Sequence, residues 1–477
     1  MLALLLALAP APVAEPPPGP ERLSRAEAVT RALAANPEVR KSQAGLESLR
    51  GRKQEALADA LPELDLVGTG TRFRDPSLLN SPGFDDFPPE FRSALRPIPA
   101  SLFDGAFQLR QTLWTFKLGA ALKAARYGLE LGREDIRRTE HEVALAAIQA
   151  YHDYVLALEK VRVTEQSIVQ KQKHLEMART RREAGVVTEL DVLRSEVDLA
   201  NVRAQLERAR GDADQTRGTL NAVMVRPIDA AIVPTDRLDR RPAAADLDEV
   251  VAAALANRAE LKVATLNVRI YEQIVKVERG ESRPRIDFAG GWGRSVREPS
   301  NFFRNDFARW NAAVTLTVPV FDGFRAAGRV AQAQASVSGA EQDLIAAENR
   351  VRLQAKQAVD RLRTAERVLD AAELNVTQAA RAVEMTQANY RYGAATTIDV
   401  LDAQAALTLA QSLRIQGLYD HANARAILRY VTGLSPLEDE LLSPGAVPPA
   451  TSSLSGGIHF RRESGGLGGV TEHPPAQ

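Results

Sequence analysis

The sequence predicts an α+β chain that is mostly helical and built from two copies of one design. Three observations carry this prediction. The pattern Gly-x-x-Thr-x-x-Asp-Val-Leu begins at Gly185 and again at Gly393, 208 residues later. Long stretches place apolar residues at alternating spacings of three and four, which is typical of coiled-coil helices. Two pairs of shorter stretches alternate apolar with polar residues, the period of a strand.

The composition narrows the classes of function. The chain has 477 residues, and its 61 Lys and Arg balance 61 Asp and Glu, so no net field draws it to nucleic acid. Cysteine is absent, which excludes disulfides, thiolate metal sites and the lipid acceptor of a lipoprotein. The six His are scattered, and no catalytic motif is present. We therefore expect no enzyme activity, no metal site and no cofactor.

The two ends of the chain are expected to lie outside the folded unit. Residues 1–14, MLALLLALAPAPVA, are too short to span a membrane and resemble a secretory signal peptide without its usual basic residues. The alternative is an apolar N-terminus with no targeting role. Residues 441–477 are rich in Pro, Gly and Ser and are predicted to form a disordered tail.

Internal repeats set the domain boundaries. ALAANPEV at Ala32 recurs as ALANRAEL at Ala254, a separation of 222 residues. We expect a first structural repeat over residues 22–224 and a second over residues 247–433. A proline-bearing segment, residues 225–246, should link them.

Each repeat is expected to follow one order of elements. A helix comes first, over residues 22–57 or 247–279. Two strands, a very long helix, the glycine motif and a further helix follow. The long helix of the first repeat, residues 118–184, would span roughly 100 Å.

The long helices carry an apolar seam rich in Ala, which lets two helix axes approach closely. The second seam has one extra step of four, a stutter that relaxes the supercoil. The first seam comprises Val143, Ala147, Ala150, Tyr154, Ala157, Val161, Thr164, Ile168, Lys171, Leu175, Ala178 and Arg182; the second comprises Val337, Ala340, Leu344, Ala347, Val351, Ala355, Ala358, Leu362, Ala365, Leu369, Ala372, Val376, Ala379, Val383, Thr386 and Tyr390.

The last expected strand, residues 310–320, places Trp310 and Val314 on one face and Asn311 and Thr315 on the other. This alternation is a weak sign of an outer-membrane β-barrel, and a soluble half-buried sheet gives the same pattern. Four strands cannot close into a barrel, so a barrel would need two or more chains.

The glycine motif predicts the end of one helix and the start of the next. Gly185 and Gly393 fit the left-handed residue just past a helix C-terminus. Thr188 and Thr396 then fit N-caps, each with an Asp three residues later to complete a capping box. Two helical hairpins are therefore expected, with their tips at the glycines.

Here the sequence resembles a known family. YRYGAATTIDVLDAQ, from Tyr390 to Gln404, and FDG, from Phe321 to Gly323, together with the duplication, resemble the TolC-like outer-membrane efflux protein family, also called outer-membrane factors. The resemblance covers essentially Arg22 to Gly433.

The resemblance implies a homotrimer in the cell outer membrane with a large periplasmic portion. Each chain would contribute four strands to one twelve-stranded β-barrel and its duplicated helical hairpins to an α-barrel below. The trimer would be a passive exit duct of a tripartite efflux or type I secretion system. A periplasmic adaptor (membrane fusion) protein would join it to an inner-membrane transporter of RND, ABC or MFS type. Whether the cargo is a drug, a metal or a protein stays open. The competing interpretation is a periplasmic coiled-coil adaptor or structural protein.

The resemblance also implies functional residues at the tips. Asp399 and Asp402 match two aspartates that form charged rings at the family's periplasmic entrance. Tyr390 and Asp191 match a pair that helps to close it. Capping alone also explains Asp399, and ordinary packing also explains Tyr390. The family has an arginine where this chain has Ala395, so the closed state should be held differently here.

Overall fold

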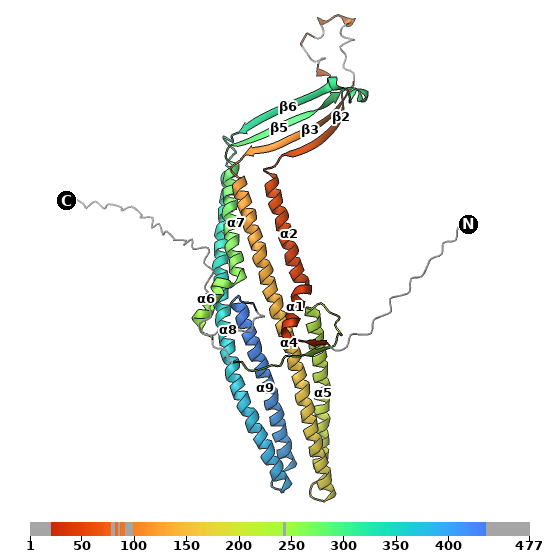
Figure 1. The fold of residues 1–477 in the computed structure, drawn as a ribbon, viewed down its shortest axis with the longest axis vertical. Coiled ribbons are helices and arrows are strands. Elements are labelled where there is room, and N and C mark those ends of the chain that lie inside the picture. The colour runs from red at the N-terminus through yellow and green to blue at the C-terminus, as the bar shows by residue number, and fades with distance from the viewer. Residues whose placement is uncertain (1–20, 78–81, 84–85, 91–98, 242–244, 436–477) are drawn as a thin grey trace, which may run out of the picture.

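The computed structural model describes residues 21–77, 82–83, 86–90, 99–241 and 245–435. The expected signal peptide and tail lie outside these residues. The chain forms a long rod of helices with a curved sheet at one end (Figure 1). Two helical hairpins form the opposite end of the rod.

The helices follow the same order in both repeats. The first repeat contains α1 (Arg25–Ala35), α2 (Pro37–Ala58), α4 (Leu118–Glu183) and α5 (Glu189–Val223). The second contains α6 (Leu247–Asn257), α7 (Ala259–Glu281), α8 (Arg325–Arg391) and α9 (Thr397–Val431). With 66 and 67 residues, α4 and α8 each extend roughly 100 Å.

The prediction of one continuous helix at the start of each repeat is wrong. Residues 22–57 form a short strand, β1 (Glu21–Leu23), and then two helices that meet at Asn36. Asn36 is extended, with ψ 129°, because it precedes Pro37, and its side chain caps α2. In the second repeat the break falls at Arg258, with ψ 125°. The Arg258 guanidinium lies over the Tyr430 ring at 4.7 Å, so a tertiary contact accompanies this break.

The predicted seams are the buried faces of the long helices. All positions of the second seam are buried or half-buried, including Leu362 and Leu369 at 1% and 0% exposure. The positions of the first seam are also buried or half-buried, with the exception of Arg182. The Arg182 side chain is exposed and pairs with Glu189 across the tip. That one assignment is wrong because the seam ends at Ala178, where the two helices separate into the turn.

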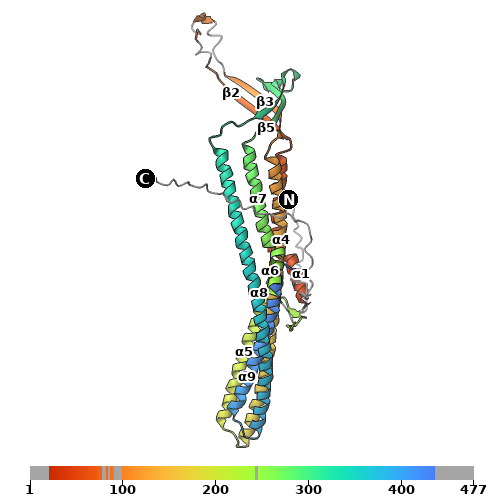
Figure 2. The same cartoon turned by 90° about the vertical axis from the view of Figure 1, so that its left-hand side faces the viewer.

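The helices pack differently in the two halves of the rod. Toward the tips, α4 pairs with α5 and α8 with α9. Toward the sheet, α2 packs on α4, and α7 lies between α4 and α8 (Figures 1 and 2). Each long helix therefore changes partners along its length: α4 packs on α5 toward its tip and on α2 and α7 toward the sheet, and α8 packs on α9 toward its tip and on α7 toward the sheet.

The strands form one antiparallel sheet in the order β2-β3-β5-β6. Its members are β2 (Glu63–Phe73), β3 (Ala100–Trp114), β5 (Arg285–Val296) and β6 (Ala308–Thr317). The connection between β5 and β6 contains two short 3₁₀ helices, η3 (Pro299–Asn301) and η4 (Asn305–Phe307). The last strand covers Ala308 to Thr317, so it begins two residues before and ends three residues before the expected range 310–320. Pro319, just past its end, has no amide hydrogen for a ladder. Within the described chain, β2 and β6 each have a strand neighbour on one side.

The strand register sorts the side chains onto two faces. Leu66, Phe107, Trp292 and Trp310 lie in one row across the four strands, and Leu66 and Trp310 are 70% and 78% exposed. The adjacent row, on the other face, is Asp65, Gln108, Gly291 and Asn311. The sheet thus exposes a large apolar face opposite a polar one. Among the helices described, none combines the length and apolarity needed to cross a bilayer.

The linker between the repeats lies against the middle of the rod. Its strand β4 (Ile232–Pro234) pairs in parallel with β1. The Tyr154 hydroxyl of α4 donates to the Ile232 carbonyl at 2.9 Å, so the linker is tied to the first long helix. It then continues across the rod toward α6.

Substitution of Leu369 tests the packing of the second seam. Leu369→Ala should lower the free energy of unfolding by about 2–5 kcal/mol, because the side chain is fully buried against α9. Leu369→Met, which nearly conserves volume, should cost less than about 1.5 kcal/mol. Thermal unfolding of the purified protein measures both, and equal effects would contradict this packing.

Candidate functional site at the hairpin tips

The two tips share one backbone geometry. Gly185 and Gly393 have φ +70° and +77°, the left-handed region. Val186 N donates to the Arg181 carbonyl at 2.9 Å, and Ala394 N donates to the Asn389 carbonyl at 2.8 Å. These bonds satisfy the last carbonyls of α4 and α8, as in a Schellman motif.

The carboxylates of Asp191 and Asp399 cap the helices that follow. Asp399 accepts from Thr396 N at 2.7 Å and from its hydroxyl at 2.6 Å, and Asp191 makes the same two bonds with Thr188 at 3.0 and 2.7 Å. The Thr396 hydroxyl, followed by its amide, lowers the pKa of Asp399 below its usual range. The Thr188 hydroxyl is the main cause of the lowered pKa of Asp191. Both groups are therefore anionic at neutral pH.

Asp402 lies one turn beyond Asp399 on α9 and is exposed. In the described part of the chain its carboxylate has no hydrogen-bond or ion-pair partner. Residues three apart lie on the same side of a helix. The two carboxylates thus give the start of α9 two negative charges, of which only that of Asp399 is engaged in a cap.

Tyr390 joins the two hairpins. It is 2% exposed. The Arg181 guanidinium of the first hairpin lies over the Tyr390 ring, 4.3 Å from its centroid, and donates to the Tyr390 carbonyl. The His174 ring packs 5.5 Å from the Tyr390 ring. Burial lowers the pKa of His174, so its ring is neutral at neutral pH.

Thr397 lies close to both Tyr390 and Asp191. The Tyr390 hydroxyl lies 3.4 Å from Thr397 Oγ1, and Thr397 is 3% exposed. Thr397 is also a minor cause of the lowered pKa of Asp191, so it lies near that carboxylate. Thr397, at the start of α9, is thus the residue that lies near both Tyr390 and Asp191.

Sequence reasoning missed Arg181, His174 and Thr397. Arg181 belongs to a basic last turn, which predicts a helix C-terminus but no partner. Its contact partner, Tyr390, lies 209 residues later in the sequence. A cation–π contact contributes about 0.5–2 kcal/mol, so this contact is a substantial part of the junction between the hairpins.

The described ranges hold no group of three or more His, Asp or Glu side chains that could bind a metal ion. The arrangement at the tips is thus one of capping, charge and packing between helices. Its chemistry suits holding two hairpins together and presenting carboxylates.

The fold and tips define an elongated, duplicated helical-hairpin protein that carries a membrane-type sheet. The chain belongs to the outer membrane efflux protein family, whose model matches residues 28–224 and 250–434. Family membership places it in the outer membrane, with a large periplasmic portion. These matches do not favour the periplasmic adaptor interpretation.

Named relatives and solved structures agree with this assignment. The chain is 26% identical to outer membrane protein OprJ of Pseudomonas aeruginosa over 82% of its own length and 79% of OprJ. It is 24% identical to outer membrane efflux protein BepC of Brucella suis over 70% of each chain. Its fold matches a membrane protein from Pseudomonas aeruginosa with a TM-score of 0.74 at 23% identity, over 90% of this chain and 99% of that one. The CmeC outer membrane channel of Campylobacter jejuni matches with a TM-score of 0.72 at 17% identity, over 87% of each chain.

Glycine substitutions test the tip geometry. Gly393→Ala should destabilise the tip by about 1 kcal/mol, because an L-residue is strained at positive φ. Gly339→Ala, in the interior of α8 with open space around it, should instead stabilise by up to about 1 kcal/mol. Amide hydrogen exchange and thermal unfolding should show that the two variants change stability in opposite directions. If both variants change stability in the same direction, the left-handed conformation assigned to Gly393 is wrong.

Proposed function

We propose that three copies of this chain form an outer-membrane channel, which is the exit duct of a tripartite efflux or secretion assembly. The observation that carries the proposal is the four-stranded sheet with an apolar exposed face and open outer strands. Among the residues described, neither β2 nor β6 has a partner on its outer side.

An open sheet edge is costly in a membrane. Each backbone N–H or C=O without a partner in hydrocarbon costs several kcal/mol, so spanning sheets close into barrels. Three chains would supply twelve strands, and β2 of one chain would pair with β6 of the next. The row from Leu66 to Trp310 would then face lipid, and the row from Asp65 to Asn311 would face the lumen.

The helical rod would continue the passage into the periplasm. Two hairpins per chain, repeated three times, would enclose a tunnel that narrows at the tips. The relatives support a role in export: one from Pseudomonas aeruginosa is named an alkaline protease secretion protein and another a pyoverdine export outer membrane protein. Their cargoes differ, which fits a passive duct that receives cargo from a periplasmic adaptor and an inner-membrane transporter of RND, ABC or MFS type.

We propose that the Arg181 contact holds the tips closed. It would take over the role of the arginine that the family has at the position of Ala395. The guanidinium fixes the second hairpin through both the ring and the carbonyl of Tyr390. Thr397, beside the Tyr390 hydroxyl, also lies near Asp191 of the first hairpin. Opening would separate the hairpins and break these bonds in each of three subunits.

We also propose that Asp399 and Asp402 form the entrance constriction. A threefold axis would gather six carboxylates, which would attract cations and repel anions. Asp402 would contribute more, because the Asp399 carboxylate is already engaged with Thr396.

Conductance of the purified protein in planar bilayers tests the closed state. Arg181→Leu should raise the open fraction about twofold to thirtyfold, since a contact of about 0.5–2 kcal/mol shifts an equilibrium by that range of factors. Arg179→Leu is the matched control, because Arg179 pairs with Glu196 inside the first hairpin. If neither variant conducts ions, the channel proposal fails; if both open equally, the Arg181 role fails.

Ion preference in the same bilayers tests the constriction. Asp402→Asn should reduce the preference for cations over anions and weaken block by multivalent cations. Asp402→Glu keeps the charge and should keep both properties. An unchanged reversal potential in Asp402→Asn would remove Asp402 from the constriction.

A further inference from the structure

The line of contact between the two hairpins is polar. Ser167, His174 and Arg181 follow one another at intervals of seven along α4, so they lie on one face of the helix. The Ser167 hydroxyl lies 3.3 Å from the Thr408 hydroxyl of α9, and His174 and Arg181 both contact Tyr390 at the end of α8. This face of α4 therefore meets the second hairpin through polar side chains.

The apolar clusters near the tips lie inside each hairpin. One cluster joins α4 to α5 and another joins α8 to α9; the first comprises Leu175, Ala178, Val192 and Leu199, and the second comprises Ala379, Val383, Leu407 and Ala410. Separation of the hairpins would leave both clusters intact. Polar and charged contacts, rather than apolar burial, therefore decide whether the hairpins stay together near the tips.

His174 lies on this line with its ring buried. It is 2% exposed, and among the described residues neither Nδ1 nor Nε2 has a hydrogen-bond partner. A neutral imidazole carries one N–H donor, whereas an imidazolium carries two. Burial of a charge, or of a donor without an acceptor, is costly. The site therefore accepts the neutral ring of His174 and disfavours the protonated one.

The charged groups that face His174 do not offset this cost. Asp198 of α5 favours a proton on the ring and Lys171 of α4 opposes it. The two are paired with each other, so the Asp198 carboxylate is already engaged. From α8, Tyr390 presents the ring over which the Arg181 guanidinium lies, at 4.3 Å. A protonated His174 would therefore be a second cation against Tyr390.

We infer that His174 is a pH switch of the tips: a proton on its ring separates it from Tyr390 and allows the second hairpin to move away from the first. The inference rests on the proposed channel function and adds a means of regulation to it. Once the hairpins separate, water can accept from both N–H groups of the ring. The intact apolar clusters keep each hairpin folded as it moves. Acid therefore opens the channel.

The direction of the pH effect follows from proton binding. Burial, the main cause, lowers the pKa of His174 in the closed tips, whereas a solvated ring has a pKa of about 6.5. The closed state thus binds fewer protons than the open one. Its advantage is complete above about pH 6.5 and is lost as the pH falls below that value. The tip carboxylates of Asp191 and Asp399 have pKa values below their usual range, so they stay ionised near pH 6.

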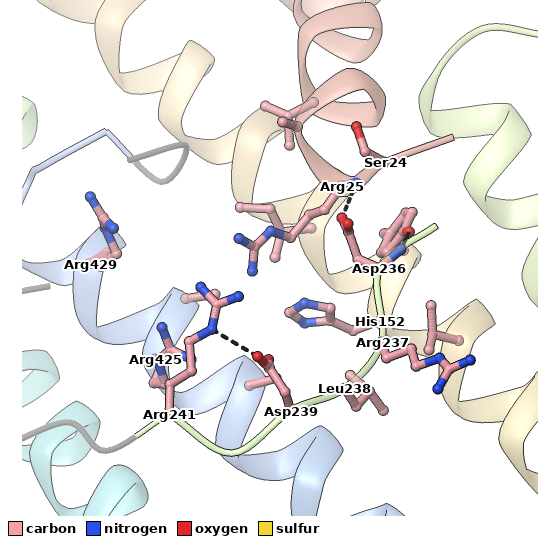
Figure 3. A pocket seen from close by; sticks show the side chains of 17 residues that line it. Ser24, Arg25, His152, Asp236, Arg237, Leu238, Asp239, Arg241, Arg425 and Arg429 are labelled. Carbon is pink, nitrogen blue, oxygen red and sulfur yellow. Dashed lines mark hydrogen bonds and ion pairs between the residues drawn. The ribbon is translucent and has the colours of Figure 1, made fainter. Parts of the chain in front are cut away.

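His152 is the matched control, because it is another buried His of α4 that contacts the second repeat. It is 4% exposed, and its Nδ1 lies 2.8 Å from Asn423 Oδ1 of α9, an acceptor for the charged ring. Its ring also lines a cavity of about 370 Å³, together with Arg25 and Asp236 (Figure 3). A cavity of this size has room for water, so protonation of His152 does not require α4 and α9 to separate.

The open fraction in planar bilayers, measured from about pH 7.5 to about pH 5.5, tests the switch. The parent protein should open as the pH falls, by up to about tenfold for each subunit that takes up a proton. His174→Leu, which cannot be protonated, should stay closed over the whole range. His152→Gln should respond to acid as the parent does. An acid response that is absent from the parent, kept by His174→Leu or lost from His152→Gln would overturn the inference, while absence of conduction at every pH would contradict the channel proposal itself.

Deuterium exchange at the imidazole C2 position, read by mass spectrometry, tests the parent protein without any variant. The exchange rate follows the protonation of each His separately. His174 should exchange slowly and show a midpoint below about pH 6.5, the value of a solvated ring. A midpoint at or above that value would show that the closed tips do not disfavour the charged ring, and the switch would be wrong even if every variant folds.

Discussion

The open edges of the four-stranded sheet are the constraint on which the rest of the structure depends. A sheet of this size cannot satisfy the outer sides of β2 and β6 by itself, and its apolar face cannot stay in water. In the proposed trimer, association of the chains would pair these edges, and lipid would cover the apolar face. Because each chain has its helices attached directly to these strands, closing the sheets would also arrange the rods around one axis. In this proposal the passage would be a consequence of strand pairing and would need no separate feature.

The long helices are held together by narrow seams of small and apolar residues. A seam rich in Ala and Leu lets α8 run against α9, and the equivalent seam lets α4 run against α5, without a conventional globular core. Each hairpin ends where Gly185 or Gly393 takes up positive φ and a Thr-Asp pair starts the next helix. Between tip and sheet, the linker joins the two repeats: β4 pairs with β1 of the first repeat, and Arg240 pairs with Asp370 and Glu373 of α8. The rod is therefore secured at three levels: the sheet, the middle and the tips.

The sequence predicted the structural features that depend on a local motif or on a periodic pattern of residues. The seams came from spacings of three and four, and the tips from a glycine followed by a Thr and an Asp, because each pattern has one dominant structural cause. The break at Asn36 had a local signal in the following proline, which disfavours the helical conformation at Asn36. The break at Arg258 has no proline after it, and its only signal was its alignment with Asn36 in the repeat; the Tyr430 ring that contacts it lies 172 residues away in sequence. The contact of Arg181 with Tyr390 likewise joins distant segments. Such contacts follow from the packing of the repeats and cannot be read from either repeat alone.

Disulfide cross-linking between β2 and β6 tests the threefold closure most directly. The chain has no cysteine, so a pair introduced at Thr69 and at successive positions from Ala312 to Thr315 would be unique. Within one chain these outer strands are three strand spacings apart, about 14 Å, which exceeds the reach of a disulfide. Oxidation in outer membranes should therefore yield covalent dimers and trimers, and no larger species, at one register. A product that stays monomeric at every register, or a ladder that continues beyond three chains, would contradict the account.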